Sequence, residues 1–549
     1  MSLFKALRNS GFISSRIRKL NLRKRVTTFS LIFWKRGEIS VSTNRCSFAN
    51  SFTTMSNHTS SKISRRTFGK KTASAASAAF AFQFIPSRAW GNLTKPTMVG
   101  IGSGGKGRSD IANSELAGFD IVGLVDVVDV KKFGANKKNN RRENVLIESR
   151  EAYPDVPFWT DYREMFADMG DKVDAVTVST PDHHHFHASV MAMQAGKHVY
   201  CQKPLTHGIW EARMMSEVAS QTGVKTQMGN QAHAEDHMRR CVELIRSGII
   251  GKVRDVHTWT NRPIWPQGFA NPPQKQKVPK WIDWKQWVGP AGHVDYNENI
   301  APFSWRGWWE YGTGALGDMA CHIMDMPYWA LMPGAPKNVK AEQAGATEFS
   351  PPINSKIVWE FGPSEHTHSR GVRFNWYDGY VDAHFDPEIW ALIKESEEYN
   401  HPSPSILDGR PFNEYGCVVV GEEGKMFFHR QNNNWVVNPT SIVDGYSWPA
   451  QSLPRARGDD KYKNHNEWFD TIAGKLVKGQ SNFELAGPFT EMILLGVLAQ
   501  RVPNENLEWD HKNMEIVGRP ELKKYIQRDY TKDWEAEVSG AGKISFAAL

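Results

Sequence analysis

Cysteine is scarce in this chain, and its cysteines follow no pairing pattern. The 549 residues include five cysteines, an odd number, and no Cys-x-x-Cys pair. Such a set indicates neither a disulfide framework nor a zinc site. Long apolar runs are also missing, since the Ala-rich stretch before residue 90 is too short and too mild for a permanent membrane anchor. The chain as a whole is 40% hydrophobic and 11% aromatic, which suffices for a globular core and two or more domains.

Excess basic charge is missing from most of the chain. Residues 1–90 hold seventeen lysines and arginines against one acid, Glu38, and so carry +16, although the whole chain carries only +8. The remaining 459 residues are therefore acidic, at −8. They contain no basic patch with interleaved aromatics. This distribution argues against a nucleic-acid-binding body, and we expect no nucleic-acid partner.

The basic leader, residues 1–90, contains an export motif. The stretch "SRRTFGKKTASAASAAFAFQFIPSRAWG" begins with the twin arginines Arg65 and Arg66, continues through Phe68 into an Ala-rich run and includes "SRA" near its end. It resembles a twin-arginine signal, which predicts export of a folded, cofactor-loaded protein to the periplasm. The alternative is a basic loop before a weak helix. Because Met55 opens a leader of ordinary length, we expect translation to start there.

A nucleotide-binding pattern follows the leader. The stretch "TMVGIGSGGKGRSDIANSELAGFDIVGLVDV" predicts a strand, a Gly-rich turn, a helix, a second strand and an acid. Gly102, Gly104 and Gly107 would supply the tight turn, the close approach to a pyrophosphate and the contact of helix with strand. Asp126 would bind the adenosine ribose hydroxyls and repel a 2′-phosphate, which favours NAD over NADP. Because of the basic residues Lys131 and Lys132, NADP remains the alternative cofactor.

The alternation of strands and helices continues to about residue 229. It predicts an α/β fold whose first domain, residues 95–229, is a doubly wound parallel sheet. Ligand groups should lie at the carboxyl ends of such strands, where "STPDHHH" and "CQKPL" fall. The predicted cofactor-binding residues there are Ser179, Thr180, Pro181, His185, Gln202 and Lys203. The run from Asp182 to His187 has no spaced Cys or Glu partner, and we expect no metal site.

A second domain is predicted over residues 230–515, followed by a tail over 516–549. Eight tryptophans fall between Trp259 and Trp309 among many prolines, which indicates a long structured insertion between sheet strands. Aromatic faces there can stack on sugar rings, or they can fill an interdomain or subunit interface. Both alternatives stay open for any one tryptophan. The predicted substrate residues are Gln231, Arg306, Trp308, Asp318 and His322.

Five motifs in order, "GIGSGGKG", "VD", "STPDHHH", "AGKHVYCQKPLT" and "GALGDMACHIMD", resemble the Gfo/Idh/MocA family over roughly residues 95–515. The resemblance implies a Rossmann domain and a C-terminal α/β domain with a large, open, mostly antiparallel sheet, often used to form homo-oligomers. It also implies nicotinamide-dependent oxidation or reduction of a small-molecule sugar, polyol or derivative.

The family's E-K-P motif maps onto Gln202, Lys203 and Pro204, with glutamine in place of the usual glutamate. A carboxylate would hold the lysine charged, whereas an amide can only hydrogen-bond it, so the role of Lys203 is left in question. The D-x-x-x-H motif maps onto Asp318 and His322, which a spacing of four places on one helix face. Lys203, Asp318 and His322 are therefore the predicted catalytic residues. Without the other motifs, a helix packed in the core would be the simpler interpretation.

Two functions follow from these predictions. In the first, His322 takes a hydroxyl proton while hydride leaves the same carbon, and Asp318 supports the imidazolium. This is NAD-dependent oxidation of a sugar, cyclitol or derivative. The alternative, implied by the resemblance because some relatives of the family have this activity, is NAD-dependent glycoside cleavage. In it, transient oxidation at C3 acidifies the C2 proton, elimination expels the aglycone and the cofactor returns to its starting state.

Overall fold

The computed structural model describes residues 95–128, 148–379, 402–410, 414–429 and 434–534. The predicted signal at Arg65 and Arg66, the proposed start at Met55 and the pair Lys131–Lys132 lie outside the described residues. Within the described ranges, no helix combines the length and the apolar character that crossing a bilayer requires.

The first sheet is parallel, as the sequence predicts. Its described strands lie in the order β3-β2-β1-β4-β5-β6. Because helices cover both faces, the central strands are buried throughout and read as apolar runs. Their bounds are β1 Thr97–Ile101, β2 Asp120–Val125, β3 Phe158–Trp159, β4 Ala175–Val178, β5 His198–Cys201 and β6 Thr226–Met228.

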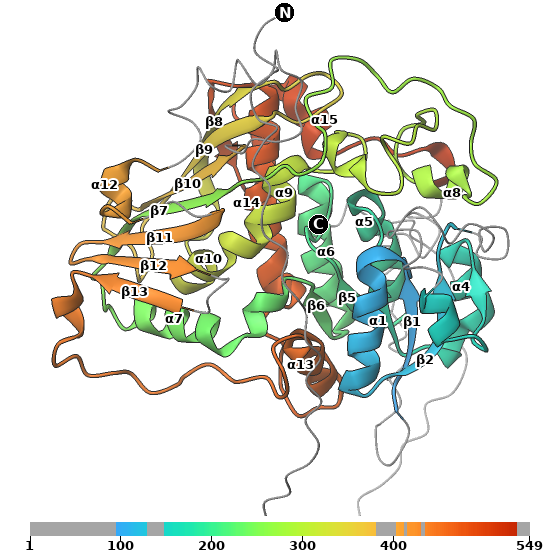
Figure 1. Cartoon of the computed structure of the whole chain (residues 1–549), viewed down its shortest axis with the longest axis horizontal. Helices are drawn as coiled ribbons and strands as arrows, with labels where there is room; N and C mark the ends of the chain where they lie inside the picture. Colours follow the sequence, from blue (N-terminus) through green and yellow to red (C-terminus); the bar gives the residue numbers. More distant parts are fainter. Residues whose placement is uncertain (1–94, 129–147, 380–401, 411–413, 430–433, 535–549) are drawn as a thin grey trace, which may run out of the picture. The chain divides into compact units, whose positions relative to one another are not determined.

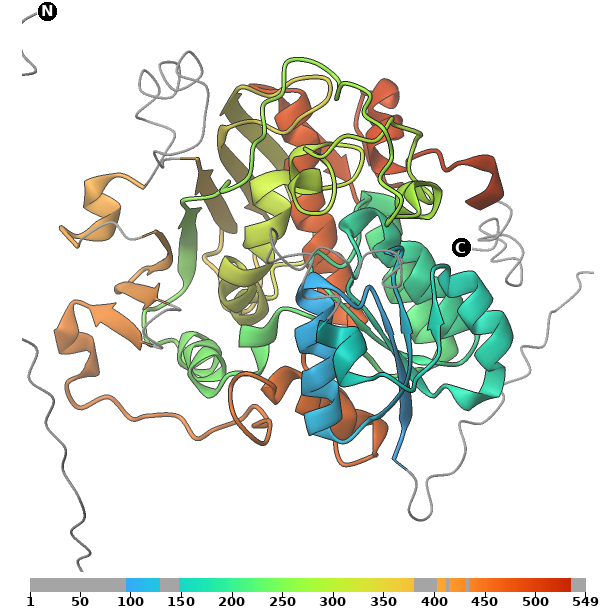
Figure 2. The same cartoon turned by 45° about the vertical axis from the view of Figure 1, so that its right-hand side comes forward.

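Four helices follow strands of this sheet: α1 Gly105–Ala117, α4 Tyr162–Met169, α5 His185–Gln194 and α6 Ile209–Thr222. The turned view shows α1 on one face of the sheet and α5 and α6 on the other (Figure 2). Right-handed crossovers that leave a central strand in opposite directions produce this arrangement. The strand order reverses between β1 and β4, and a crevice for ligands is expected at their carboxyl ends.

The second sheet is mostly antiparallel, as the family resemblance implies. Its described strands lie in the order β13-β12-β11-β7-β10-β9-β8-β14-β15, and only β7 and β10 pair in parallel (Figure 1). Their bounds are β7 Val253–Thr260, β8 Pro336–Ala344, β9 Asn354–Phe361, β10 Val372–Asp378, β11 Tyr415–Gly421, β12 Lys425–His429, β13 Asn434–Asn438, β14 Asn506–Asp510 and β15 Glu515–Ile516.

Helix α14, Phe483–Arg501, joins the two layers (Figure 1). It is apolar and buried around most of its circumference, as a helix between two layers must be. One side contacts α6, and another contacts β8 and β9. At the contact with α6, a Cβ on Gly487 would lie 1.9 Å from Ser216 Oγ, so only glycine allows the helices to come this close.

Late segments of the chain complete the core of the first domain. On α13, Lys463–Ile472, the side chain of Trp468 is fully buried with Met98, Ile111 and Phe119 beneath α1. Residues 516–534, predicted as part of a tail, bring Trp534 into the main core cluster. The boundary near residue 230 therefore separates the two sheets but does not separate their hydrophobic cores.

Helices α7 Asp236–Arg246, α9 Gly314–Ile323 and α10 Asp325–Leu331 belong to the second domain. The tryptophan-rich stretch lies between β7 and β8, as predicted for an insertion between sheet strands. It includes the short helix α8, Trp284–Val288, and the 3-10 turn η4, Ser304–Gly307. It has its own buried cluster, which contains Trp284, Trp287, Trp305 and Trp308.

Candidate active site

A cavity of about 580 Å³ lies at the carboxyl ends of the first sheet. The first domain contributes the Gly-rich loop and the loops that follow β2, β4 and β5. The second domain contributes side chains from the tryptophan-rich stretch, and His322 from α9. Groups that are far apart in the sequence therefore share one enclosed space.

Glycine is required at two positions of the Gly-rich loop. Gly102 has a φ of +80°, and a Cβ there would lie 2.7 Å from the backbone carbon of Ser179. Gly107 lies in the first turn of α1, where a Cβ would lie 1.7 Å from the carbonyl oxygen of Gly102. The first glycine makes the turn, and the second lets α1 approach the strand. Gly104 precedes α1 and lines the cavity.

Asp126 follows β2 and also lines the cavity. Its Oδ2 accepts a hydrogen bond from the Gly104 N–H at 3.0 Å, and its Oδ1 accepts one from the Val128 N–H at 3.2 Å. Burial raises the pKa of Asp126, although these backbone donors oppose the shift. The carboxylate thus fixes the Gly-rich loop, and its role toward a ribose stays a prediction.

These residues fit a dinucleotide. The loop leaves no room for a Cβ at Gly102, the N-terminus of α1 provides backbone N–H groups, and an acid lies at the end of β2. That combination is the one by which a pyrophosphate and a ribose are held. Lys106 lines the cavity as well and was missed by the sequence analysis, although it lies inside the quoted glycine motif.

The loop after β4 carries Ser179, Thr180 and Pro181, all of which line the cavity. His185 does not line it. Its ring hydrogen-bonds the carbonyls of Thr180, at 2.9 Å, and Pro204, at 2.7 Å. The histidine therefore ties the loop after β4 to the loop after β5.

The rest of the histidine run also has structural contacts. His183 and His184 both bond the carbonyl of Trp287, at 2.8 and 2.9 Å. Within the described ranges, no group of three or more His, Cys, Asp or Glu side chains is arranged to hold a metal ion.

Lys203 and Asp318 meet across the two domains. Lys203 Nζ donates to Asp318 Oδ1 at 2.8 Å and to the Asp318 carbonyl at 2.9 Å. Arg306 Nε donates to the same Oδ1 at 3.1 Å. Burial alone would raise the pKa of Asp318, but the two cations outweigh it and hold that pKa well below its usual range. The carboxylate is therefore ionised and pairs with both cations.

Helix α9 has two different faces. Leu316, Ala320 and Ile323 are buried in the core, whereas Asp318 and His322 are only partly buried. His322 lines the cavity, and when its ring is protonated the positive charge helps to lower the pKa of Asp318. The sequence placed Asp318 as the support of His322. The structure adds that the same carboxylate is bonded to Lys203 and Arg306, which the spacing within one helix could not indicate.

Gln202 does not lie against Lys203 as a hydrogen-bond partner. Its Nε2 donates to Asp110 Oδ2 at 2.9 Å. Asp110 lies on α1 and is fully buried. It was missed by the sequence analysis because an acid in an amphipathic helix is usually exposed, and no local pattern marks this one.

A second missed acid, Asp182, lines the cavity and is 4% exposed. Its Oδ2 accepts a hydrogen bond at 3.0 Å from the hydroxyl of Thr313, which precedes α9. Burial raises the pKa of Asp182 to about 7, with Arg306 and Lys203 opposing the shift. Its place in "STPD", at a strand end, was the available signal.

Some of the predicted substrate residues line the cavity and others do not. Gln231 and Arg306 line the cavity, and Arg306 lies over the ring of Trp305, 4.1 Å from its centroid. Trp308 does not line it. That indole stacks on Phe269, with centroids 4.3 Å apart, and its Nε1 donates to the carbonyl of Asn299. The Phe, Tyr and Trp residues that do line the cavity are Tyr162, Trp281, Trp287, Phe303 and Trp305.

Two family models match the chain. Residues 97–230 match the Gfo/Idh/MocA model described as oxidoreductase family, NAD-binding Rossmann fold. Residues 239–345 match the model described as oxidoreductase family, C-terminal alpha/beta domain.

Curated relatives match over part of their length. Levoglucosan dehydrogenase of Pseudarthrobacter phenanthrenivorans is 24% identical over 30% of this chain and 35% of its own. D-xylose 1-dehydrogenase (NADP+) of Hypocrea jecorina is 28% identical over 31% of this chain and 42% of its own. The chain thus spans between about a quarter and about a half of the length of these curated relatives and others that it matches. A solved structure, aldose-aldose oxidoreductase from Caulobacter crescentus complexed with glycerol, aligns at 16% identity and a TM-score of 0.48, covering 76% of this chain and 100% of that one.

Proposed function

Because the chain carries both domains of the Gfo/Idh/MocA oxidoreductase family, we propose that it transfers hydride between NAD and a hydroxyl-bearing carbon of a sugar, cyclitol or sugar derivative. One observation carries the proposal. The pair Lys203–Asp318, closed at 2.8 Å, lies beside a cavity that His322 and the Gly-rich loop both line. A cofactor site and proton-transfer groups are thus brought together.

Each group has a chemical role that its contacts support. NAD bound along the Gly-rich loop and Asp126 would supply the hydride acceptor. His322 takes the proton of the substrate hydroxyl. Lys203 uses two of its three N–H donors on Asp318, which leaves a third for the substrate oxygen as negative charge develops on it. Asp318 pairs with this lysine and fixes its position, which is the part that a glutamate at position 202 was expected to play.

Other residues that line the cavity suit a sugar or polyol. Trp305 and Phe303 offer apolar faces to a ring. Gln231, whose Nε2 also donates to Tyr200 at 3.4 Å, and Arg306 offer polar contacts for hydroxyl groups. The names of the relatives, levoglucosan dehydrogenase and D-xylose 1-dehydrogenase, are consistent with this substrate class.

The second candidate function is glycoside cleavage through transient oxidation. It requires a second proton-transfer group, because after oxidation at C3 a base must remove the C2 proton before the aglycone leaves with its electron pair. Asp182 favours this candidate, since it lines the same cavity and its pKa is raised to about 7 by burial. Water then adds across the C1–C2 double bond that the elimination leaves, and hydride returns to C3, so no net NADH forms.

One experiment tests both candidates. The purified protein is incubated with NAD and a panel of sugars, polyols and glycosides, while NADH absorbance and free aglycone are both followed. Net oxidation predicts NADH without aglycone, and transient oxidation predicts aglycone without lasting NADH. If no member of the panel yields either NADH or free aglycone, the proposed function is contradicted.

Two further properties belong to the same proposal. We propose export of the folded, cofactor-loaded protein to the periplasm, supported by the twin arginines Arg65 and Arg66. Replacing both with lysine should leave the protein in the cytoplasm, and unchanged export would contradict the proposal. We also propose a homo-oligomer formed through the open second sheet, which sedimentation of the purified protein would test.

A further inference from the structure

Asp110 is a fully buried carboxylate with polar partners on both of its oxygens. Its Oδ1 accepts from Lys106 Nζ at 2.7 Å and lies 3.3 Å from His465 Nε2. Its Oδ2 accepts from Ser179 Oγ at 2.9 Å and from Gln202 Nε2 at 2.9 Å. Burial raises the pKa of Asp110, but Lys106 and the other donors outweigh this and lower it to about 2. The group is therefore an anion at neutral pH.

Three of the four partners line the cavity: Lys106, Ser179 and Gln202. They come from three separate places, namely the first turn of α1, the loop after β4 and the loop after β5. The fourth partner, His465, comes from α13 in the second half of the chain. One buried charge therefore sets the positions of three side chains in the wall of the proposed cofactor site.

The same contact explains why position 202 holds an amide. An ionised carboxylate only accepts hydrogen bonds, so Gln202 must turn its N–H toward Asp110. A glutamate at 202 would place a second carboxylate at about the same distance, where two like charges cannot both ionise without a large cost. Asp110 and Gln202 are thus complementary, and the departure of "QKP" from the family motif is matched by an acid on α1.

We propose that Asp110 is a positioning residue for the nicotinamide cofactor, which acts through Gln202, Ser179 and Lys106. The proposal rests on the proposed NAD-dependent function. It assigns no contact between Asp110 and the cofactor, since Asp110 itself does not line the cavity.

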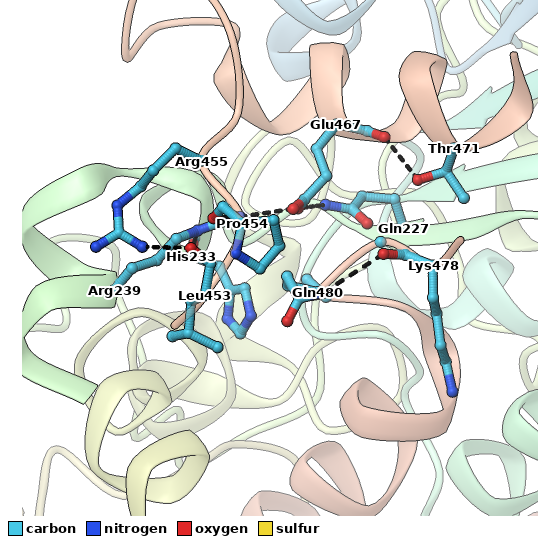
Figure 3. A network of polar contacts seen from close by, with 12 residues as sticks. Gln227, His233, Arg239, Leu453, Pro454, Arg455, Glu467, Thr471, Lys478 and Gln480 are labelled. Carbon is cyan, nitrogen blue, oxygen red and sulfur yellow. Dashed lines mark hydrogen bonds and ion pairs between the residues drawn. The ribbon is translucent and has the colours of Figure 1, made fainter. Parts of the chain in front are cut away.

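A purely structural role is the alternative, and the chain contains a matched control. Glu467 on α13 is also almost fully buried. Its carboxylate accepts from Arg239 Nη2 at 2.7 Å and from Gln227 Nε2 at 3.0 Å (Figure 3). Neither partner lines the cavity. Glu467→Gln therefore removes a buried charge of the same kind without touching the wall of the site.

The experiment compares four variants: Asp110→Asn, Gln202→Glu, the double variant with both changes, and Glu467→Gln. Dissociation constants for NAD are measured by titration of the full-length protein, and melting temperatures are measured beside them. We expect Asp110→Asn and Gln202→Glu each to weaken NAD binding about ten-fold or more. In the first variant a buried amide N–H faces other hydrogen-bond donors, and in the second two buried carboxylates face each other. Glu467→Gln should lower the melting temperature but leave NAD affinity within about two-fold.

The double variant separates the alternatives most clearly. It restores an amide facing a carboxylate with the two positions exchanged, so NAD affinity should recover to within about three-fold of the wild type. If either single variant fails to fold, the NAD affinity of the double variant still tests the proposal. A double variant that folds but binds no better than the single variants would overturn the proposal, and so would an Asp110→Asn protein with unchanged affinity. If the wild-type protein does not bind NAD, the proposed function is overturned as well. This outcome is seen in the titration of the wild type alone and is therefore distinguishable from failure of the proposal about Asp110.

Discussion

Lys203 Nζ lies 2.8 Å from Asp318 Oδ1 and 2.9 Å from the carbonyl of the same residue, which joins the loop after β5 to helix α9. The contact is polar, largely buried and made between the two domains. Because Arg306 binds the same carboxylate oxygen, Asp318 pairs with two of the cations that line the cavity, Lys203 and Arg306.

Removing the charge of Asp318 should therefore affect Lys203 more than it affects the fold. In Asp318→Asn the lysine loses its ionic partner and its fixed position, and we expect kcat to fall roughly 10²-fold with little change in NAD affinity. Steady-state kinetics and cofactor titration measure the two quantities. Equal losses in kcat and in NAD affinity would contradict this role.

Asp182 should give the protein a pH-dependent stability of known sign. Burial raises its folded-state pKa from the ordinary value of 3.8 to about 7. The stability it contributes is therefore fully present at low pH and is lost as pH rises through about 7. Asp182→Asn does not titrate, so the variant should gain melting temperature relative to the wild type between about pH 5 and about pH 8. A difference that stays constant across this range would contradict the shift.

Cofactor preference should follow Asp126. We expect the wild type to bind NAD about ten-fold or more tightly than NADP, or about 1.4 kcal/mol. Asp126→Asn keeps the shape of the side chain and an acceptor for the Gly104 N–H, but it loses the charge that repels a 2′-phosphate. The ratio of the two affinities should therefore fall toward one. A wild-type protein that binds both equally would remove Asp126 from the ribose role.

The Gly-rich turn can be tested against a glycine of left-handed conformation elsewhere in the first domain. Gly102→Ala would meet the backbone of Ser179, whereas Gly223, which ends α6 with a φ of +67°, has nothing within 4 Å. Gly223→Ala should cost only about 1 kcal/mol of stability and leave NAD binding unchanged. Gly102→Ala should cost more and abolish NAD binding. Similar behaviour of the two variants would show that strain alone, and not the close approach, sets the requirement.

The parts of the fold that the sequence predicted are those with local signals. Gly102, Gly104 and Gly107 mark a turn that strand, helix and acid surround within about thirty residues, and the spacing of Asp318 and His322 fixes their face of α9. In each case the pattern and the structure it specifies lie in the same short segment.

The parts that it missed depend on packing between distant segments. Asp110 gains its role from Gln202, 92 residues away, and from His465 on α13, and no local period reports such contacts. Trp305 and Trp308 are three residues apart in one irregular stretch, yet only Trp305 lines the cavity. The composition could indicate that aromatic side chains line a site, but it could not identify which of the indoles do so.

The central claim, that His322 takes the substrate proton in an NAD-dependent oxidation, is tested most directly by the turnover of His322→Ala. With a substrate from the sugar and polyol panel, we expect kcat to fall by roughly 10²–10⁴, while NAD affinity and the melting temperature stay close to those of the wild type, because His322 belongs to the partly buried face of α9. A His322→Ala protein that keeps near-normal turnover would contradict the account, and one that melts early and loses NAD binding together with turnover would assign the residue to the core of the helix instead.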